Sequence, residues 1–181
     1  QLHNRIGGIM ITIDGGTGVI LHNGVKFNKE SDKMYDEWRR TSNGSGTGTI
    51  TLDWERNDTN FALTGSGMTE SSGIFTFPST GIYRVTYHIM GWRDGDTAFF
   101  GCNLMLSTDS GSSYNTVSYS RNSNSNDGDA YATAHGWGTI DVTNVSTFKL
   151  RFDVDSSGTW NWRGSSNFNE TFASFERIGD T

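Results

Sequence analysis

Residues 74–92 read IFTFPSTGIYRVTYHIMGW, and this stretch decides the fold. In its second half Tyr83, Val85, Tyr87 and Ile89 recur at every second position, which is typical of a β-strand. Pro78, the only proline of the chain, lies between the two apolar parts of the stretch and favours a turn there. The stretch therefore predicts two strands, over 74–77 and 82–92.

Similar strand patterns recur along the rest of the chain, and the clearest runs from Phe148 to Val154. Phe148, Leu150, Phe152 and Val154 alternate there with charged residues, so one face is expected in the core and the other in water. Further strands are expected at 50–54, 61–63, 98–106, 116–120, 130–140 and 168–178. The pattern predicts an all-β sandwich or barrel, with one short helix left open over residues 29–40.

The length of the chain, 181 residues, suits one domain with a shorter attached segment. Residues 9–27 predict two or three short strands, and residues 41–49, TSNGSGTGT, have the composition of a linker. We therefore expect an N-terminal segment with its linker at 1–45 and a β domain at 46–181.

Charge and cysteine content exclude several classes of protein. A net charge of -6 gives no basis for following a phosphate backbone, so no nucleic-acid binding is expected, and Arg39 and Arg40 are interpreted as a solvated charged segment. The single cysteine, Cys102, allows no intrachain disulfide and alternates in phase with apolar neighbours, which predicts a buried, inert thiol. No apolar run reaches the ~20 residues of a membrane helix, so no membrane insertion is expected.

One strand carries large side chains on both faces, and a second strand alternates large side chains with alanines. Tyr83 and Tyr87 belong to the first, and Tyr131, His135 and Trp137 belong to the second. A lone sandwich would leave aromatic patches exposed, which soluble monomers usually avoid. The pattern predicts a subunit interface, and a covering loop from the same chain is the alternative.

The block at 74–92 and the ending NETFASFERIGD, at 169–180, resemble the corresponding parts of C1q/TNF-like domains. The resemblance covers roughly residues 48–181. It implies a C1q/TNF-like jelly-roll sandwich that assembles as a homotrimer around a threefold axis. The residues expected at the trimer interface are Tyr83, Tyr87, Tyr131, His135, Trp137, Phe172 and Phe175.

The N-terminal block ITIDGGTGVILHNGVKF, at 11–27, resembles a phrase found near the start of bacteriophage fibre and other virion proteins. The resemblance implies a small β-rich segment that attaches the protein to other virion proteins, on the tail or on the capsid surface. The residues expected to make this attachment are Ile11, Ile13, Val19, Val25 and Phe27.

Catalytic motifs are missing from the sequence, which contains no G-x-S-x-G, no H-E-x-x-H and no P-loop. The carboxylate pairs at 94 and 96, 127 and 129, and 153 and 155 are interpreted as turn or solvated residues rather than as a glycosidase pair. The loop at 122–129, NSNSNDGD, departs from a calcium-binding loop. We therefore expect no enzyme activity, no metal site and no cofactor, with a calcium ion kept as an alternative.

Aromatic residues in expected turns are the candidates for recognition. Trp160, Trp162, Arg163 and Tyr114 are expected to contact a host glycan or protein, since Trp and Arg planes stack on sugars or anchor in pockets. The alternative is that the two tryptophans fill the core. The sequence predicts a short trimeric tail fibre or adhesin, with a trimeric capsid decoration protein as the alternative and a bacterial C1q-like lectin as a more distant one.

Overall fold

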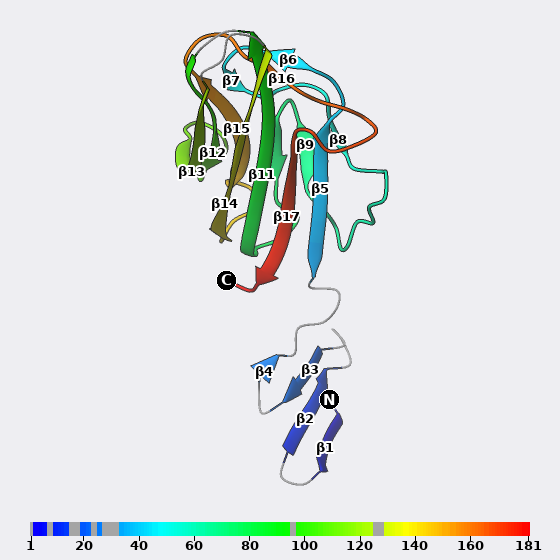
Figure 1. Cartoon of the computed structure of the whole chain (residues 1–181). Helices are drawn as coiled ribbons and strands as arrows, with labels where there is room; N and C mark the ends of the chain where they lie inside the picture. The colour runs from blue at the N-terminus through cyan, green and yellow to red at the C-terminus, as the bar shows by residue number, and fades with distance from the viewer. Residues whose placement is uncertain are drawn as a thin grey trace. The chain divides into compact units, whose positions relative to one another are not determined.

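The computed structural model describes residues 2–6, 9–14, 19–22, 25–26, 33–94, 97–124 and 129–181. Every regular element in these ranges is a β-strand (Figure 1). The chain divides into two compact units, Gln1–Lys33 and Met34–Thr181. Among the described residues no helix is long and apolar enough to cross a membrane.

The first unit is a four-stranded antiparallel sheet in which each strand pairs with the next along the chain. Its strands are β1 (Leu2–Ile6), β2 (Ile9–Asp14), β3 (Val19–His22) and β4 (Val25–Lys26). Of the residues expected to attach to the virion, Ile11 and Ile13 lie in β2, Val19 begins β3 and Val25 begins β4. Phe27 lies outside the described residues.

The second unit contains two sheets. The first sheet has six strands: β13 (Asn115–Asn124), β12 (Thr97–Ser107), β15 (Lys149–Ser156), β10 (Ile74–Thr76), β9 (Thr69–Ser71), and β7 (Gly48–Thr49) beside β15. The second has seven: β6 (Gly44–Ser45), β16 (Asn161–Trp162), β11 (Gly81–Asp94), β17 (Phe172–Gly179), β5 (Met34–Arg40), β8 (Trp54–Arg56), and β14 (Asp129–Val142) beside β11. From β10 to β17 the chain crosses repeatedly between the sheets, as in a jelly roll.

Aromatic side chains from both sheets meet in the core between them. Phe75 lies at its centre, with ring centroids 5.7 Å from Trp38, 5.4 Å from Trp54, 5.7 Å from Phe152 and 5.1 Å from Phe175. Such tilted and edge-on arrangements are the favoured geometries of packed aromatic rings. The all-β jelly-roll prediction is confirmed.

Two strand-level predictions are confirmed by burial. In β15 Leu150, Phe152 and Val154 are buried, and the charged residues between them are partly exposed. Cys102 is fully buried in β12, and burial raises the pKa of its thiol well above the usual value. A thiol in this environment has little thiolate, so it is unreactive.

Residues 34–49 differ from their prediction. Residues 34–40 lie within the stretch for which a helix is one expectation, but they form β5, which pairs with β17 from Met34 to Arg39. The supposed linker supplies β6 and β7, which pair with β16 and β15. The second unit therefore begins at Met34, twelve residues before the predicted boundary. The stretch at 61–63, predicted as a strand, lies in a loop.

The physical reason is that β5 buries charged residues. Its inward positions are Met34, Asp36, Trp38 and Arg40, so a search for alternating apolar residues overlooks it. Asp36 is fully buried and accepts hydrogen bonds from Trp38 Nε1 at 2.9 Å, Arg56 Nε at 2.9 Å and the Met68 amide at 2.7 Å. These partners satisfy the carboxylate, which makes its burial tolerable.

Candidate subunit interface

The outer face of β11 and β14 carries the strongest candidate site. Tyr83, Val85, Tyr87 and Ile89 of β11 point into the core, so the residues between them point outward. The register places His88 opposite His135, Thr86 opposite Trp137 and Trp92 opposite Tyr131. Side chains from two strands are thereby gathered on one surface.

This surface is aromatic and partly open. Trp137 is 59% exposed and Tyr131 57% exposed. The Arg84 guanidinium lies 5.8 Å from the centroid of the Trp137 ring, and the Phe172 ring stacks on His88 at 5.2 Å. We call this surface, made by Arg84, His88, Tyr131, His135, Trp137 and Phe172, the β11/β14 face.

Of the two histidines on the β11/β14 face, His88 is less exposed than His135. Its ring centroid lies 5.8 Å from that of His135, and its other ring neighbour is Phe172, which stacks on it. Burial lowers the pKa of His88, and the neighbouring His135 lowers it further. The neutral imidazole is therefore favoured in the folded chain.

Four of the seven residues predicted at the trimer interface share the β11/β14 face: Tyr131, His135, Trp137 and Phe172. The prediction is wrong for Tyr83, Tyr87 and Phe175, because all three are fully buried between the sheets of one chain. Tyr83 donates to the Ser79 carbonyl at 2.9 Å and Tyr87 to the Cys102 carbonyl at 3.3 Å. When both faces of a strand carry large side chains, alternation does not say which face points inward.

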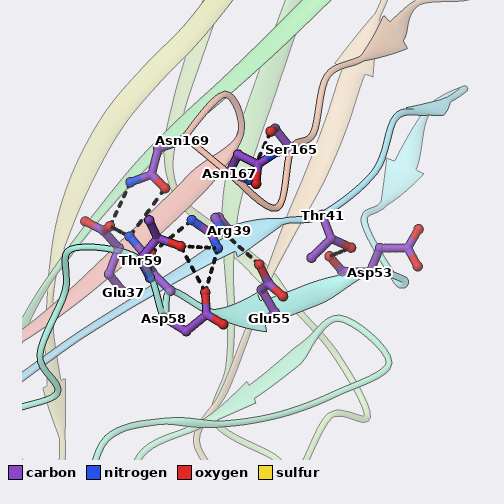
Figure 2. A network of polar contacts seen from close by, with 11 residues as sticks. Glu37, Arg39, Thr41, Asp53, Glu55, Asp58, Thr59, Ser165, Asn167 and Asn169 are labelled. Carbon is purple, nitrogen blue, oxygen red and sulfur yellow. Dashed lines mark hydrogen bonds and ion pairs between the residues drawn. The ribbon is translucent and has the colours of Figure 1, made fainter.

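A buried arginine occupies the other part of the same sheet's outer face, on β5 (Figure 2). Arg39 is only 1% exposed because the chain's own residues cover it. Its Nε donates to Glu55 at 2.8 Å, its Nη1 to Asn57 at 3.1 Å and its Nη2 to Asp58 at 2.8 Å. The expectation that Arg39 and Arg40 are solvated is wrong, since both are buried and hydrogen-bonded.

Asparagine side chains extend this network across the sheet. Asn57 Nδ2 donates to Glu37 Oε1 at 2.6 Å, and Asn169 Nδ2 donates to the same oxygen at 2.7 Å. Figure 2 shows the Asn169 amide directed at Glu37. The chain's own loop thus covers the β5 part of the sheet, whereas Tyr131 and Trp137 are left open on β14.

The four residues predicted to bind a receptor do not form one site. The prediction is wrong for Trp160, which is fully buried with its ring 4.7 Å from that of Phe100. Trp162 is also buried, in β16 beside β11, and Arg163 is paired with Glu170 at 3.3 Å. Tyr114 lies just before β13 in the other sheet, under the Arg151 guanidinium at 4.0 Å.

The carboxylates on β15 are engaged in structural contacts. Asp153 accepts from Thr49 Oγ1 at 2.7 Å and from Arg151 at 2.9 Å, and Asp155 is paired with Arg121. Parts of the other two carboxylate pairs, and the centre of the loop at 122–129, lie outside the described residues. The calcium alternative therefore stays a prediction.

Comparison with known proteins supports the fold. No family model and no curated protein matches the sequence. Among solved structures, Eiger TNF from S. frugiperda is similar with a TM-score of 0.66 at 11% identity, over 82% of this chain and 94% of that chain. Murine APRIL, in its crystal structure at pH 5.0, is similar with a TM-score of 0.60 at 13% identity, over 81% of this chain and 99% of that one. The chain therefore has the TNF-like jelly-roll fold.

Proposed function

We propose that the protein is a non-enzymatic, homotrimeric virion protein of a bacteriophage, a short tail fibre or adhesin whose jelly roll binds a receptor on the host surface. The observation that carries the proposal is the β11/β14 face, an open aromatic surface on the outside of the β-sandwich. The sequence resemblance to C1q/TNF-like domains implies the same assembly.

The composition of the face suits a buried contact between subunits. Tyr131 and Trp137 each expose more than half of their side-chain surface, and aromatic residues are enriched in the cores of interfaces. The polar network around Arg39 lies on the same sheet and would provide a hydrated border, as rims of interfaces do. Closed threefold contacts would cover the face in every subunit equally.

The first unit supports a role in attachment. Its sheet belongs to a compact unit of its own, and the block at 11–27 resembles the start of virion proteins. In the proposed assembly this unit joins the particle and the jelly roll projects toward the host.

A capsid decoration protein is the second candidate. The four-stranded sheet of the first unit is open, with β1 and β4 as its edges, and edge strands are ready to pair with strands of another chain. Extended pairing of this kind with shell subunits would suit a trimer that stabilises a capsid.

Two measurements on the full chain test the proposal. Light scattering should give about 60 kDa, three times the 20.0 kDa chain mass, and a stable monomer would overturn the trimer. Labelled protein should bind intact host cells at micromolar concentration. Binding to shell particles that lack the protein, without binding to cells, would support decoration instead.

A further inference from the structure

A hollow lies where β6, β7 and β16 meet the loop at 51–53. Figure 1 shows these three strands at the end of the second unit opposite the C-terminus. The hollow has a volume of about 310 Å³, within the range of small-molecule sites. We call it the β6/β7 pocket, and its lining includes Arg40, Ser45, Thr47, Thr51, Asp53 and Trp162.

The chain builds this pocket by joining both sheets with one short segment. β6 pairs with β16 of one sheet, and β7 pairs with β15 of the other. Gly44 lies directly against the indole of Trp162, so any side chain at residue 44 would collide with the ring. The glycine therefore lets the segment approach Trp162 closely.

A fixed donor and a fixed acceptor lie side by side in the pocket wall. The Arg40 guanidinium donates to the Ser42 carbonyl at 3.2 Å, to the Leu52 carbonyl at 2.7 Å and to Asp53 Oδ2 at 3.4 Å. These three bonds hold it in place, and only 4% of its side chain is exposed, so it borders the pocket as a fixed positive charge.

Asp53 supplies the acceptor. Its side chain is 46% exposed, and its Oδ2 also accepts from Ser42 Oγ at 2.6 Å. Figure 2 shows its carboxylate pointing away from the Arg39 network. Asp53 adopts a φ of 61°, a left-handed conformation that is uncommon outside glycine and is often found at functional sites.

Trp162 adds an aromatic ring to the wall. It is 7% exposed, and its Nε1 has no hydrogen-bond partner among the described residues. The Arg40 guanidinium lies 5.8 Å from the centre of its ring, which keeps the indole in place. The Nε1 atom itself is buried against Gly44, so the indole borders the pocket with its ring and not with its N–H.

We propose that the β6/β7 pocket binds one neutral sugar residue of a glycan. Sugar hydroxyls both donate and accept, so they match an adjacent guanidinium and carboxylate, together with the hydroxyls of Ser45, Thr47 and Thr51. The Asp53 carboxylate disfavours an anion, and the polar lining disfavours an apolar ligand. The biological meaning of this site, though not the binding itself, rests on the proposed receptor-binding function.

The test uses the full chain and neutral monosaccharides: glucose, galactose, mannose and N-acetylglucosamine. Saturation-transfer NMR and titration should detect at least one of them, with a Kd on the order of 1 mM. Asp53→Asn should weaken binding about tenfold, since it removes a charged acceptor. Thr47→Trp should abolish binding by filling the pocket from an exposed position. Asp141→Asn, on exposed β14, is the matched control and should bind as the unmodified chain does.

The outcomes separate this site from the proposed function. Two results overturn the pocket even if the chain is trimeric and binds host cells. The first is no signal from any sugar, and the second is that Asp53→Asn and Thr47→Trp both bind a sugar as tightly as the unmodified chain does. Sugar binding that Thr47→Trp abolishes supports the pocket even in a monomer that ignores host cells, and the proposed function then fails alone.

Discussion

His88 and His135 face each other across β11 and β14, with ring centroids 5.8 Å apart and ring planes inclined at 64°. Phe172 stacks on the first of them at 5.2 Å and limits its access to water. Two imidazolium ions at this separation would repel each other, and the covered one would lose part of its hydration. His88 therefore favours the neutral state.

This relationship predicts a loss of stability in mild acid. The pKa of His88 is lowered from 6.5 in the folded chain, so the unfolded chain binds the proton first as pH falls. The contribution of neutral His88 to the free energy of unfolding is complete above pH 6.5. It is lost as the pH falls through 6.5 toward the lower pKa of His88 in the folded chain. Thermal unfolding should show a lower Tm at pH 5 than at pH 7.5, and His88→Gln should reduce this difference. An unchanged difference in the variant would rule out His88 as its source.

The β11/β14 face predicts that two aromatic residues hold the trimer together. Trp137→Ser and Tyr131→Ser should each weaken the contact between subunits, because truncating a buried interface aromatic typically costs about 2 kcal/mol or more. Light scattering across a dilution series should show dissociation at higher protein concentration than for the unmodified chain. Tyr119→Ser is the matched control, since Tyr119 is 65% exposed on β13 of the other sheet. Equal dissociation of all three variants would contradict the interface.

Substitution of Trp160 is expected to change the stability of the fold and not the binding of a receptor. Because the side chain is fully buried against Phe100, Trp160→Ala should lower the free energy of unfolding by about 3–5 kcal/mol. Trp160→Phe should cost much less, because the indole Nε1 has no hydrogen-bond partner among the described residues. Urea unfolding measures both. If the Trp160→Ala variant lost host-cell binding while its stability stayed unchanged, the result would contradict the burial of Trp160 and support a role in binding.

Arg39 predicts that a charged residue stabilises the sheet from its outer face. Arg39→Ala removes the group that joins Glu55, Asn57 and Asp58, so the free energy of unfolding should fall by about 3 kcal/mol. Arg121→Ala is the control, since that arginine is 47% exposed and its pair with Asp155 is worth about 1 kcal/mol or less. Similar losses in the two variants would show that burial adds nothing to the Arg39 network.

The sequence predicted those parts of the fold in which burial follows hydrophobicity. In β15 Leu150, Phe152 and Val154 alternate with charged residues, so one pattern gives the strand and its inward face. β5 was not predicted as a strand, because Asp36 and Arg40 take inward positions in it. Hydrogen-bond partners far along the chain make this burial possible. No local pattern contains that information.

The candidate sites show the same division. Tyr131 and Trp137 could be predicted as a surface because small residues alternate with them on β14. The β6/β7 pocket could not, because Arg40, Asp53 and Trp162 come together only when a glycine-rich segment bridges two sheets. The composition of residues 41–49 is typical of a linker, so it does not predict that the segment pairs with both sheets.

Gly73 tests how tightly the turn between β9 and β10 is packed. The residue has a φ of 80°, and a side chain there would collide with the Ile50 carbonyl and lie 2.9 Å from Thr51 Cα. Backbone atoms cannot move aside as a flexible side chain can, so Gly73→Ala should cost more than the ~1–2 kcal/mol of the left-handed conformation alone. Gly46→Ala is the matched control, since Gly46 has a φ of 103° and nothing within 4 Å of an added Cβ. Urea unfolding of the two variants should therefore show a larger loss for Gly73→Ala, and equal losses would mean that the turn yields without cost.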